Sequence, residues 1–232
     1  MGAADELLGE DVVWVPLSLT LIEYPQGDLL GKLLATISLM PFAVLSGFVT
    51  LILFRRDLHT IVFFGGVVIN ELLNYVLKHI IQEPRPMRRD TLYSEHGMPS
   101  THAQFMWFIA AYMTLFVIYR LHQISEKFWR ILIVLACIAS ALLVTYSRIY
   151  LQYHTYSQVT YGAIIGAIVG IAWFIFVHNI LTPIFPVILT WKLSEYLLIR
   201  DTTLIPNILW FEYTHVRSEA RTRRKLVSMK SQ

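Results

Sequence analysis

The chain has 232 residues, of which 56% are hydrophobic and only 15% are charged. This apolar excess is larger than the core of a soluble domain of that size requires. The formal net charge of +3 is small and reflects a basic stretch at 221–225, so we predict no nucleic-acid partner. The single cysteine, Cys137, permits neither an internal disulfide framework nor a cysteine-based zinc site.

The N-terminal 31 residues contain Asp and Glu but neither Lys nor Arg. A cleavable signal peptide normally starts with a basic segment, so we expect none here. Residues 11–25 are apolar but interrupted, and this pattern favours a segment that lies at the membrane interface.

Five apolar segments follow, and each is about long enough to cross a bilayer as a helix. A spanning helix needs about 20 mostly apolar residues. Several such segments in one chain argue against a soluble fold. We therefore predict an all-α, multi-pass transmembrane helix bundle with about five spans, within a range of four to six. The predicted spans are 33–54, 59–81, 102–119, 130–147 and 159–178.

The second apolar segment differs from the others because it contains a polar stripe. Asn70, Asn74 and Lys78 recur at every fourth position, so they share one face of a helix. Polar side chains inside a membrane normally face the bundle interior or an aqueous cavity. We expect Asn70 and Asn74 to form hydrogen bonds with a neighbouring helix.

The fifth segment carries a stripe of small residues, Gly162, Gly166 and Gly170. Such a stripe allows close helix contact, and we interpret it as packing within the bundle, with dimerisation as the alternative. Residues 180–210 are apolar but interrupted by prolines and charges, which favours an interfacial segment, although a sixth span near 180–200 would also fit. The predicted domains are an N-terminal segment (1–32), a transmembrane catalytic bundle (33–178) and an interfacial segment with a basic tail (179–232).

The connections between these spans sort onto two sides of the membrane. Lys and Arg are concentrated on one side, in 55–58, 120–129 and the C-terminal tail. The positive-inside rule places that side in the cytosol. The segments 1–32, 82–101 and 148–158 would then face the lumen or the exterior.

Two histidines and three cationic side chains gather at the predicted outer ends of the spans. Fixed cations stabilise the negative charge that spreads over the oxygens of a transferring phosphoryl group. One histidine can attack phosphorus while the other protonates the leaving oxygen. This pattern favours phosphoryl transfer at a membrane surface. The residues concerned are Lys78, Arg85, His102, Arg148 and His154.

The start of the third span adds hydrogen-bond donors to this group. Ser100, Thr101 and His102 follow a proline there. We expect Thr101 to cap the helix, with Gln104 three residues later completing a capping box. Free backbone N–H groups at such a helix start can bind phosphate.

The order and spacing of these residues resemble the three signature motifs of the type-2 phosphatidic-acid phosphatase superfamily. The motifs are Lys-x6-Arg-Pro at 78–86, Pro-Ser-Thr-His at 99–102 and Ser-Arg-x5-His at 147–154. The resemblance implies that His154 is the nucleophile, which forms a phosphohistidine, and that His102 is the general acid. It also implies neither a metal nor a dissolved cofactor. The residues expected to bind the phosphoryl group are Lys78, Arg85, Ser100, Thr101 and Arg148.

The chain departs from the superfamily pattern at two positions. Thr101 stands where the second motif usually has glycine. Gln158 stands four residues after His154, where the superfamily usually has an aspartate that orients the histidine and stabilises its positive charge. The carbonyl oxygen of Gln158 can still accept a hydrogen bond from Nδ1 and so fix the tautomer. An amide cannot, however, offset the charge of the ring as a carboxylate does.

Longer stretches resemble a narrower family within this superfamily, the dolichyl diphosphate phosphatases. The implied reaction is hydrolysis of dolichyl diphosphate to dolichyl phosphate and inorganic phosphate, at the lumenal face of the endoplasmic reticulum membrane, which recycles the lipid carrier for protein N-glycosylation. The alternatives are a broader lipid phosphate phosphatase, acting on phosphatidate or other prenyl diphosphates, and a non-catalytic lipid-phosphate binder. The stretches are 76–86, 97–108, 146–159, 172–176 and 198–213.

Overall fold

The computed structural model describes only part of the chain in detail. The predicted N-terminal segment is therefore described only in part, and the predicted loop 82–101 only at its two ends. The described residues are 14–16, 22–87, 96–120, 127–203, 205 and 208–230.

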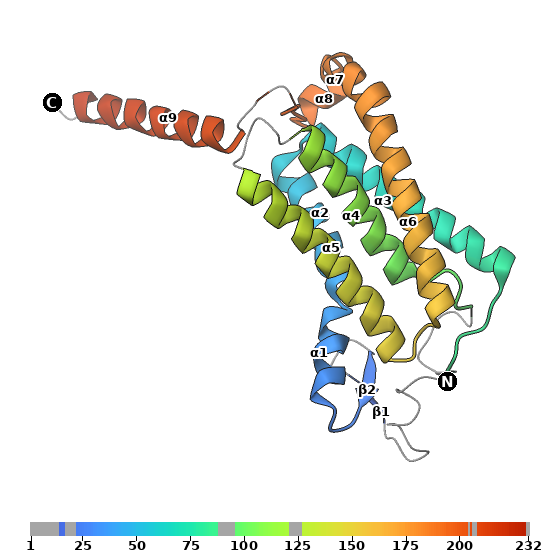
Figure 1. The fold of residues 1–232 in the computed structure, drawn as a ribbon. Helices are drawn as coiled ribbons and strands as arrows, with labels where there is room; N and C mark the ends of the chain where they lie inside the picture. The colour runs from blue at the N-terminus through green and yellow to red at the C-terminus, as the bar shows by residue number, and fades with distance from the viewer. Residues whose placement is uncertain are drawn as a thin grey trace.

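Five helical segments of the described chain are long and apolar enough to cross a membrane, and they form one bundle (Figure 1). The predictions of an all-α fold and of five spans are therefore confirmed. The first segment joins two helices, and the last continues through a π-helical turn. The spans are α1–α2 (Leu29–Ile37 and Met40–Arg55), α3 (Leu58–Ile81), α4 (Thr101–Tyr119), α5 (Lys127–Tyr150) and α6 to α7 (Tyr156–Phe176, Val177–Leu181 and Thr182–Leu189).

The last span is longer than the sequence predicts. Its helix continues beyond the expected end at residue 178 and reaches Leu189. Pro183 lacks the N–H that would continue the helical hydrogen-bond ladder, and the π-helical turn Val177–Leu181 ends two residues before it. After α7, only the short helix α8 (Lys192–Tyr196) follows within 180–203, so the described chain contains no sixth span.

A two-stranded antiparallel hairpin precedes the bundle, with β1 (Trp14–Pro16) paired to β2 (Glu23–Pro25). It lies beside α1, at the same end of the bundle as the turn between α5 and α6 (Figure 1). The backbone N–H of Glu23 donates to the Tyr153 hydroxyl at 2.9 Å. This contact ties the hairpin to the turn that carries His154.

The packing of α6 against α4 depends on the glycine stripe. A Cβ on Gly166 would overlap the carbonyl oxygen of Gln104, and one on Gly170 would lie 2.6 Å from the carbonyl oxygen of Phe108. The two helices can be this close only because glycine has no side chain. The prediction that this stripe packs within the bundle is confirmed.

We expect Gly166→Ala to lower the stability of the bundle by about 1–3 kcal/mol, the usual range for overpacking a close contact. The matched control is Gly47→Ala in α2, where, apart from the adjoining helix backbone, no atom of the described chain lies within 4 Å of the place that the new methyl group would take. That change should be neutral or stabilising by up to about 1 kcal/mol, since alanine favours a helix over glycine. Thermal unfolding of both variants in detergent tests this, and equal unfolding temperatures would contradict it.

The polar stripe of α3 faces α4. Asn74 Nδ2 donates to Gln104 Oε1 at 2.8 Å, and Gln104 Nε2 donates to Asn70 Oδ1 at 3.1 Å. All three side chains are buried. The prediction that Asn70 and Asn74 bond a neighbouring helix is confirmed.

The predicted capping box at the start of α4 is wrong. Ser100, not Thr101, is the N-cap, and no side-chain capping bond forms there. The Thr101 hydroxyl donates instead to Asn74 Oδ1 at 2.9 Å. The side chain of Gln104 cannot turn back to the helix start, because it is hydrogen-bonded to the polar stripe of α3.

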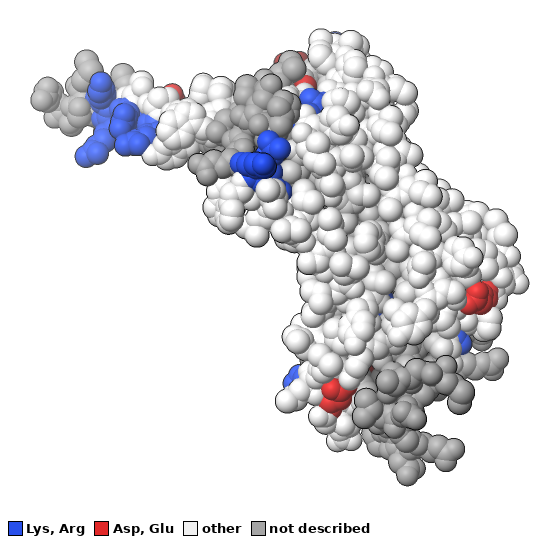
Figure 2. Space-filling model, in the orientation of Figure 1, with Lys and Arg blue, Asp and Glu red and all other residues white. Residues whose placement is uncertain are grey.

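The end of the bundle opposite the β1–β2 hairpin carries helix α9 (Ile208–Lys230), which extends away from the spans (Figure 1). Glu212 anchors this helix to Arg55 at 2.7 Å and to Arg200 at 3.4 Å. Lys and Arg side chains mark α9 and the adjoining end of the bundle, whereas the middle of the visible face is almost free of charge (Figure 2).

Candidate active site

The predicted site residues lie at one end of four spans. Lys78 is in the last turn of α3, and Arg85 follows it in the loop. Ser100 is the N-cap of α4, and Arg148 is in the last turn of α5. His102, His154 and Gln158 lie in the first turn of α4, in the turn between α5 and α6, and in the first turn of α6.

His154 is buried and held from two directions. Its Nδ1 lies 3.2 Å from Gln158 Oε1, and its Nε2 lies 3.3 Å from Arg85 Nη1. The backbone N–H of His154 also donates to the carbonyl of Arg148 at 3.2 Å. The ring therefore presents Nε2 toward a guanidinium group, which is the arrangement that an attacking nitrogen needs beside a bound phosphoryl group.

Arg148 is fixed by contacts that the sequence does not indicate. Its Nη1 donates to Ser38 Oγ at 3.3 Å, and its guanidinium lies 3.9 Å from the centre of the Tyr153 ring. Arg148 is 4% exposed. A side chain oriented in this way loses little further freedom when it binds phosphate oxygens.

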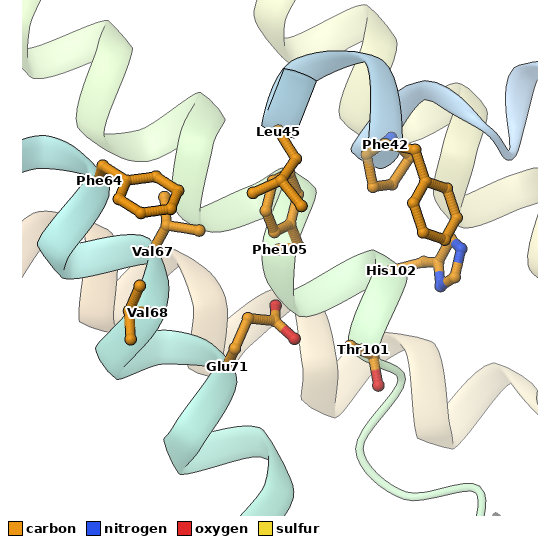
Figure 3. Close-up of a pocket in the computed structure, with 10 residues that line it drawn as sticks. Phe42, Leu45, Phe64, Val67, Val68, Glu71, Thr101, His102 and Phe105 are labelled. Atoms are coloured by element: carbon orange, nitrogen blue, oxygen red, sulfur yellow. The ribbon is translucent and has the colours of Figure 1, made fainter. Parts of the chain in front are cut away.

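His102 borders an apolar cavity of about 280 Å³ between α2, α3 and α4. Its imidazole lies against the Phe42 ring, with the two ring centres 6.2 Å apart, and Figure 3 shows these rings side by side at one edge of the cavity. The carboxyl group of Glu71 points into the same cavity. Apolar side chains therefore extend from the predicted general acid into the membrane-spanning part of the bundle.

Three cationic side chains influence the charge of the two histidines. Lys78, Arg85 and Arg148 all act electrostatically on both His102 and His154. Burial lowers the pKa of His154 well below its usual range, and the charges of the three cations lower it further, while the hydrogen bond with Gln158 opposes the shift. The neutral form, which carries the attacking lone pair, is therefore favoured.

We expect formation of a phosphoenzyme to continue below the pH at which an ordinary histidine becomes protonated. An imidazole with the usual pKa of about 6.5 would lose about nine-tenths of its neutral form by about pH 5.5. Because the pKa of His154 is lowered, its neutral form persists through that range. Single-turnover rates measured at a series of pH values test this, and a tenfold loss of rate by about pH 5.5 would contradict it.

Gln158 has more partners than the sequence predicts. It completes a capping box with Thr155 at the start of α6, a Thr-x-x-Gln signal that was visible in the sequence. Its Nε2 donates to Glu83 Oε1 at 2.9 Å and to the Pro84 carbonyl at 2.8 Å. Glu83 was not among the predicted site residues, because it belongs to a loop without periodicity.

Ser100 and Thr101 differ in their availability to a ligand. Ser100 is buried, its N–H donates to the backbone carbonyl of Gln158 at 3.1 Å, and its Oγ has no hydrogen-bond partner within the described residues. The Thr101 hydroxyl already donates to Asn74. Within the described part of the chain, no group of three or more His, Cys, Asp or Glu side chains could hold a metal ion.

The profile of the PAP2 superfamily matches residues 59–181, a segment that contains every candidate site residue. The chain belongs to the PAP2 superfamily. A transmembrane PAP2-type phosphatidylglycerolphosphate phosphatase from Bacillus subtilis has a similar fold, with a TM-score of 0.55 at 20% identity over 65% of this chain and 78% of that one.

Several curated proteins match most of the chain. Human dolichyldiphosphatase 1 is 51% identical over 99% of this chain and all of its own length. Dolichyldiphosphatase 1 of Dictyostelium discoideum is 39% identical over 92% of this chain and 94% of its own. Lipid phosphate phosphatase gamma of Arabidopsis thaliana is 41% identical over 87% of this chain and 90% of its own. These relatives identify this PAP2 protein as a hydrolase.

Proposed function

We propose that this PAP2 protein hydrolyses dolichyl diphosphate to dolichyl phosphate and inorganic phosphate through a phosphohistidine on His154. The observation that carries the proposal is the position of His154 Nε2, 3.3 Å from the guanidinium of Arg85, in a site whose second histidine borders an apolar cavity. A phosphoryl group bound by the cations would meet the nucleophile on one side and the acid on the other.

The proposed reaction has two steps. His154 Nε2 forms a bond to the terminal phosphorus, the P–O bond to dolichyl phosphate breaks, and His102 donates a proton to the leaving oxygen. A water molecule then attacks the phosphohistidine and gives a proton to His102, and the N–P bond breaks to release inorganic phosphate. Lys78, Arg85 and Arg148 would stabilise the phosphoryl charge throughout.

The apolar cavity supports a lipid as the substrate. Phe42, Leu45 and Phe105 line it next to His102, so a prenyl chain could leave the phosphate site without crossing water. Burial of apolar surface would contribute to binding in proportion to the area removed from water. The similarity to dolichyldiphosphatases along the whole chain favours dolichyl diphosphate among lipid substrates.

A panel of substrates tests this function. Purified protein in chelator-containing buffer would be given dolichyl diphosphate, dolichyl phosphate, farnesyl diphosphate and phosphatidate, and the released phosphate would be measured. We expect the highest kcat/KM with dolichyl diphosphate. Equal rates on phosphatidate would instead favour the broader lipid phosphatase that the similarity to lipid phosphate phosphatase gamma suggests. Binding without turnover would favour a non-catalytic binder.

We also infer that the protein resides in the endoplasmic reticulum membrane with the site facing the lumen, where it would recycle the lipid carrier for N-glycosylation. The support is the concentration of Lys and Arg at the end that carries α9. An N-glycosylation acceptor inserted between residues 88 and 95 should be modified in cells, whereas one inserted after Lys225 should not. The reverse pattern would reject the orientation.

A further inference from the structure

The side-chain amide of Gln158 has a fixed orientation. Its Oε1 lies 3.3 Å from the backbone nitrogen of Thr155 and 3.2 Å from His154 Nδ1. Its Nε2 lies 2.9 Å from Glu83 Oε1 and 2.8 Å from the Pro84 carbonyl oxygen. A backbone N–H can only donate and a carbonyl can only accept. The partners therefore place a proton on His154 Nδ1 and leave the lone pair on Nε2.

The loop that supplies Glu83 is folded onto this amide. Gly97 N–H donates to the Glu83 carbonyl at 2.6 Å, and Pro84 pairs with His96 in a β-bridge. A Cβ on Gly97 would lie 2.5 Å from Gln158 Oε1. Gly97 therefore covers the amide closely, and Gln158 is fully buried. In such buried surroundings, hydrogen bonds that are linked in series polarise one another.

We propose that Glu83 is a positioning residue that supplies, through Gln158, the negative charge that the superfamily pattern usually places next to the nucleophilic histidine. Two linked hydrogen bonds make the connection. His154 Nδ1–H donates to Gln158 Oε1, and Gln158 Nε2–H donates to the Glu83 carboxylate. This inference rests on the proposed role of His154 as nucleophile.

The charge is needed because the surroundings of His154 are strongly cationic. When Nε2 bonds to phosphorus, the imidazole becomes positively charged while its Nδ1 keeps its proton. Glu83 would stabilise this cation through the polarised amide. It would also hold the ring in the tautomer that attacks. The cationic groups acting on His154 are Arg148, Arg85 and Lys78.

Glu83→Gln isolates the charge, because the new amide oxygen can still accept the hydrogen bond from Gln158. We expect kcat to fall roughly tenfold to a hundredfold, somewhat less than the usual loss for a group in direct contact with the reacting atoms. KM should change less than about threefold, since the phosphate-binding cations remain. A purely structural role of Glu83 would leave kcat unchanged in this isosteric variant.

An exchange of the two groups provides the sharper test. Gln158→Glu alone puts a second carboxyl group beside that of Glu83, and two adjacent carboxylates cannot both ionise easily. Combining Gln158→Glu with Glu83→Gln preserves the net charge and places the carboxylate directly beside His154. We expect the double variant to recover at least tenfold in kcat over Glu83→Gln. A double variant no more active than either single variant would overturn the proposal, as would wild-type kcat in Glu83→Gln.

Binding of orthovanadate separates this proposal from the proposed substrate, because vanadate can bond to His154 Nε2 without any lipid. We expect Glu83→Gln to weaken vanadate binding about tenfold, measured by calorimetry, and the double variant to restore it. Wild-type protein that binds vanadate but does not hydrolyse dolichyl diphosphate would reject the substrate alone. Equal vanadate affinity in wild type and Glu83→Gln, or no vanadate binding by the wild type, would reject the role of Glu83.

Discussion

His154→Ala should abolish turnover and phosphoenzyme formation together. The imidazole is the proposed nucleophile, and its Nε2 faces Arg85 at 3.3 Å in a buried site. Removing the nucleophile leaves only binding and charge stabilisation, so we expect a loss of at least about 10⁴-fold in kcat. Rapid quenching with labelled diphosphate should trap an adduct on the wild type that acid destroys and base preserves.

His79→Ala is the matched control for this experiment. His79 lies near the same end of α3, but it is exposed and its Nδ1 contacts the Tyr75 carbonyl at 2.8 Å. This variant should keep wild-type kcat and form the adduct normally. An adduct that persists in His154→Ala would transfer the nucleophilic role to another residue, and failure of both variants would point to a damaged fold.

His102→Ala should impair substrates in proportion to the basicity of their leaving group. General acid catalysis typically contributes ~10²–10⁴-fold, with the most basic leaving oxygen needing the proton most. The leaving group from dolichyl diphosphate is dolichyl phosphate, a weakly basic phosphate monoester. The leaving group from a lipid monophosphate is a strongly basic alkoxide. We expect kcat to fall about 10²-fold with dolichyl diphosphate and about 10⁴-fold with phosphatidate.

The ratio of the two losses distinguishes an acid from a binding residue. If His102 only contacted the phosphoryl group or the apolar cavity, both substrates would lose activity by the same factor, mainly through KM. Phe42→Leu provides a control, because Phe42 packs against His102 with ring centres 6.2 Å apart but carries no proton. This variant should affect lipid binding without separating the two leaving groups. Parallel losses in His102→Ala would remove the acid role.

The bundle was predictable because its determinants are local. Apolar segments of spanning length identify the five spans, and a period of four residues places Asn70 and Asn74 on one buried face. The glycine stripe of α6 predicts close helix packing for the same reason. The spacing of Lys78, Arg85, His102, Arg148 and His154 also indicates phosphoryl chemistry, because each lies at a helix end or in the loop next to one.

The details near the loops were less predictable. Thr101 was expected to cap α4, but its hydroxyl bonds Asn74 of α3, 27 positions away. The last span was expected to end at residue 178, but after a π-helical turn the helix continues through Pro183. In both cases contacts or backbone adjustments outside the local pattern override the local preference.

The sequence by itself determined the class of protein, its five spans and the residue types that could transfer a phosphoryl group. Only the tertiary structure decided how those residues are held. Glu83 and Gln158 are 75 positions apart, and Arg148 and Ser38 are 110 apart. A periodic sequence pattern cannot link residues at such separations. The course of the loops and the close packing of α4 on α6 bring them together. The sequence has an amide, Gln158, where the superfamily usually has a carboxylate beside the histidine, and the fold places the Glu83 carboxylate next to that amide.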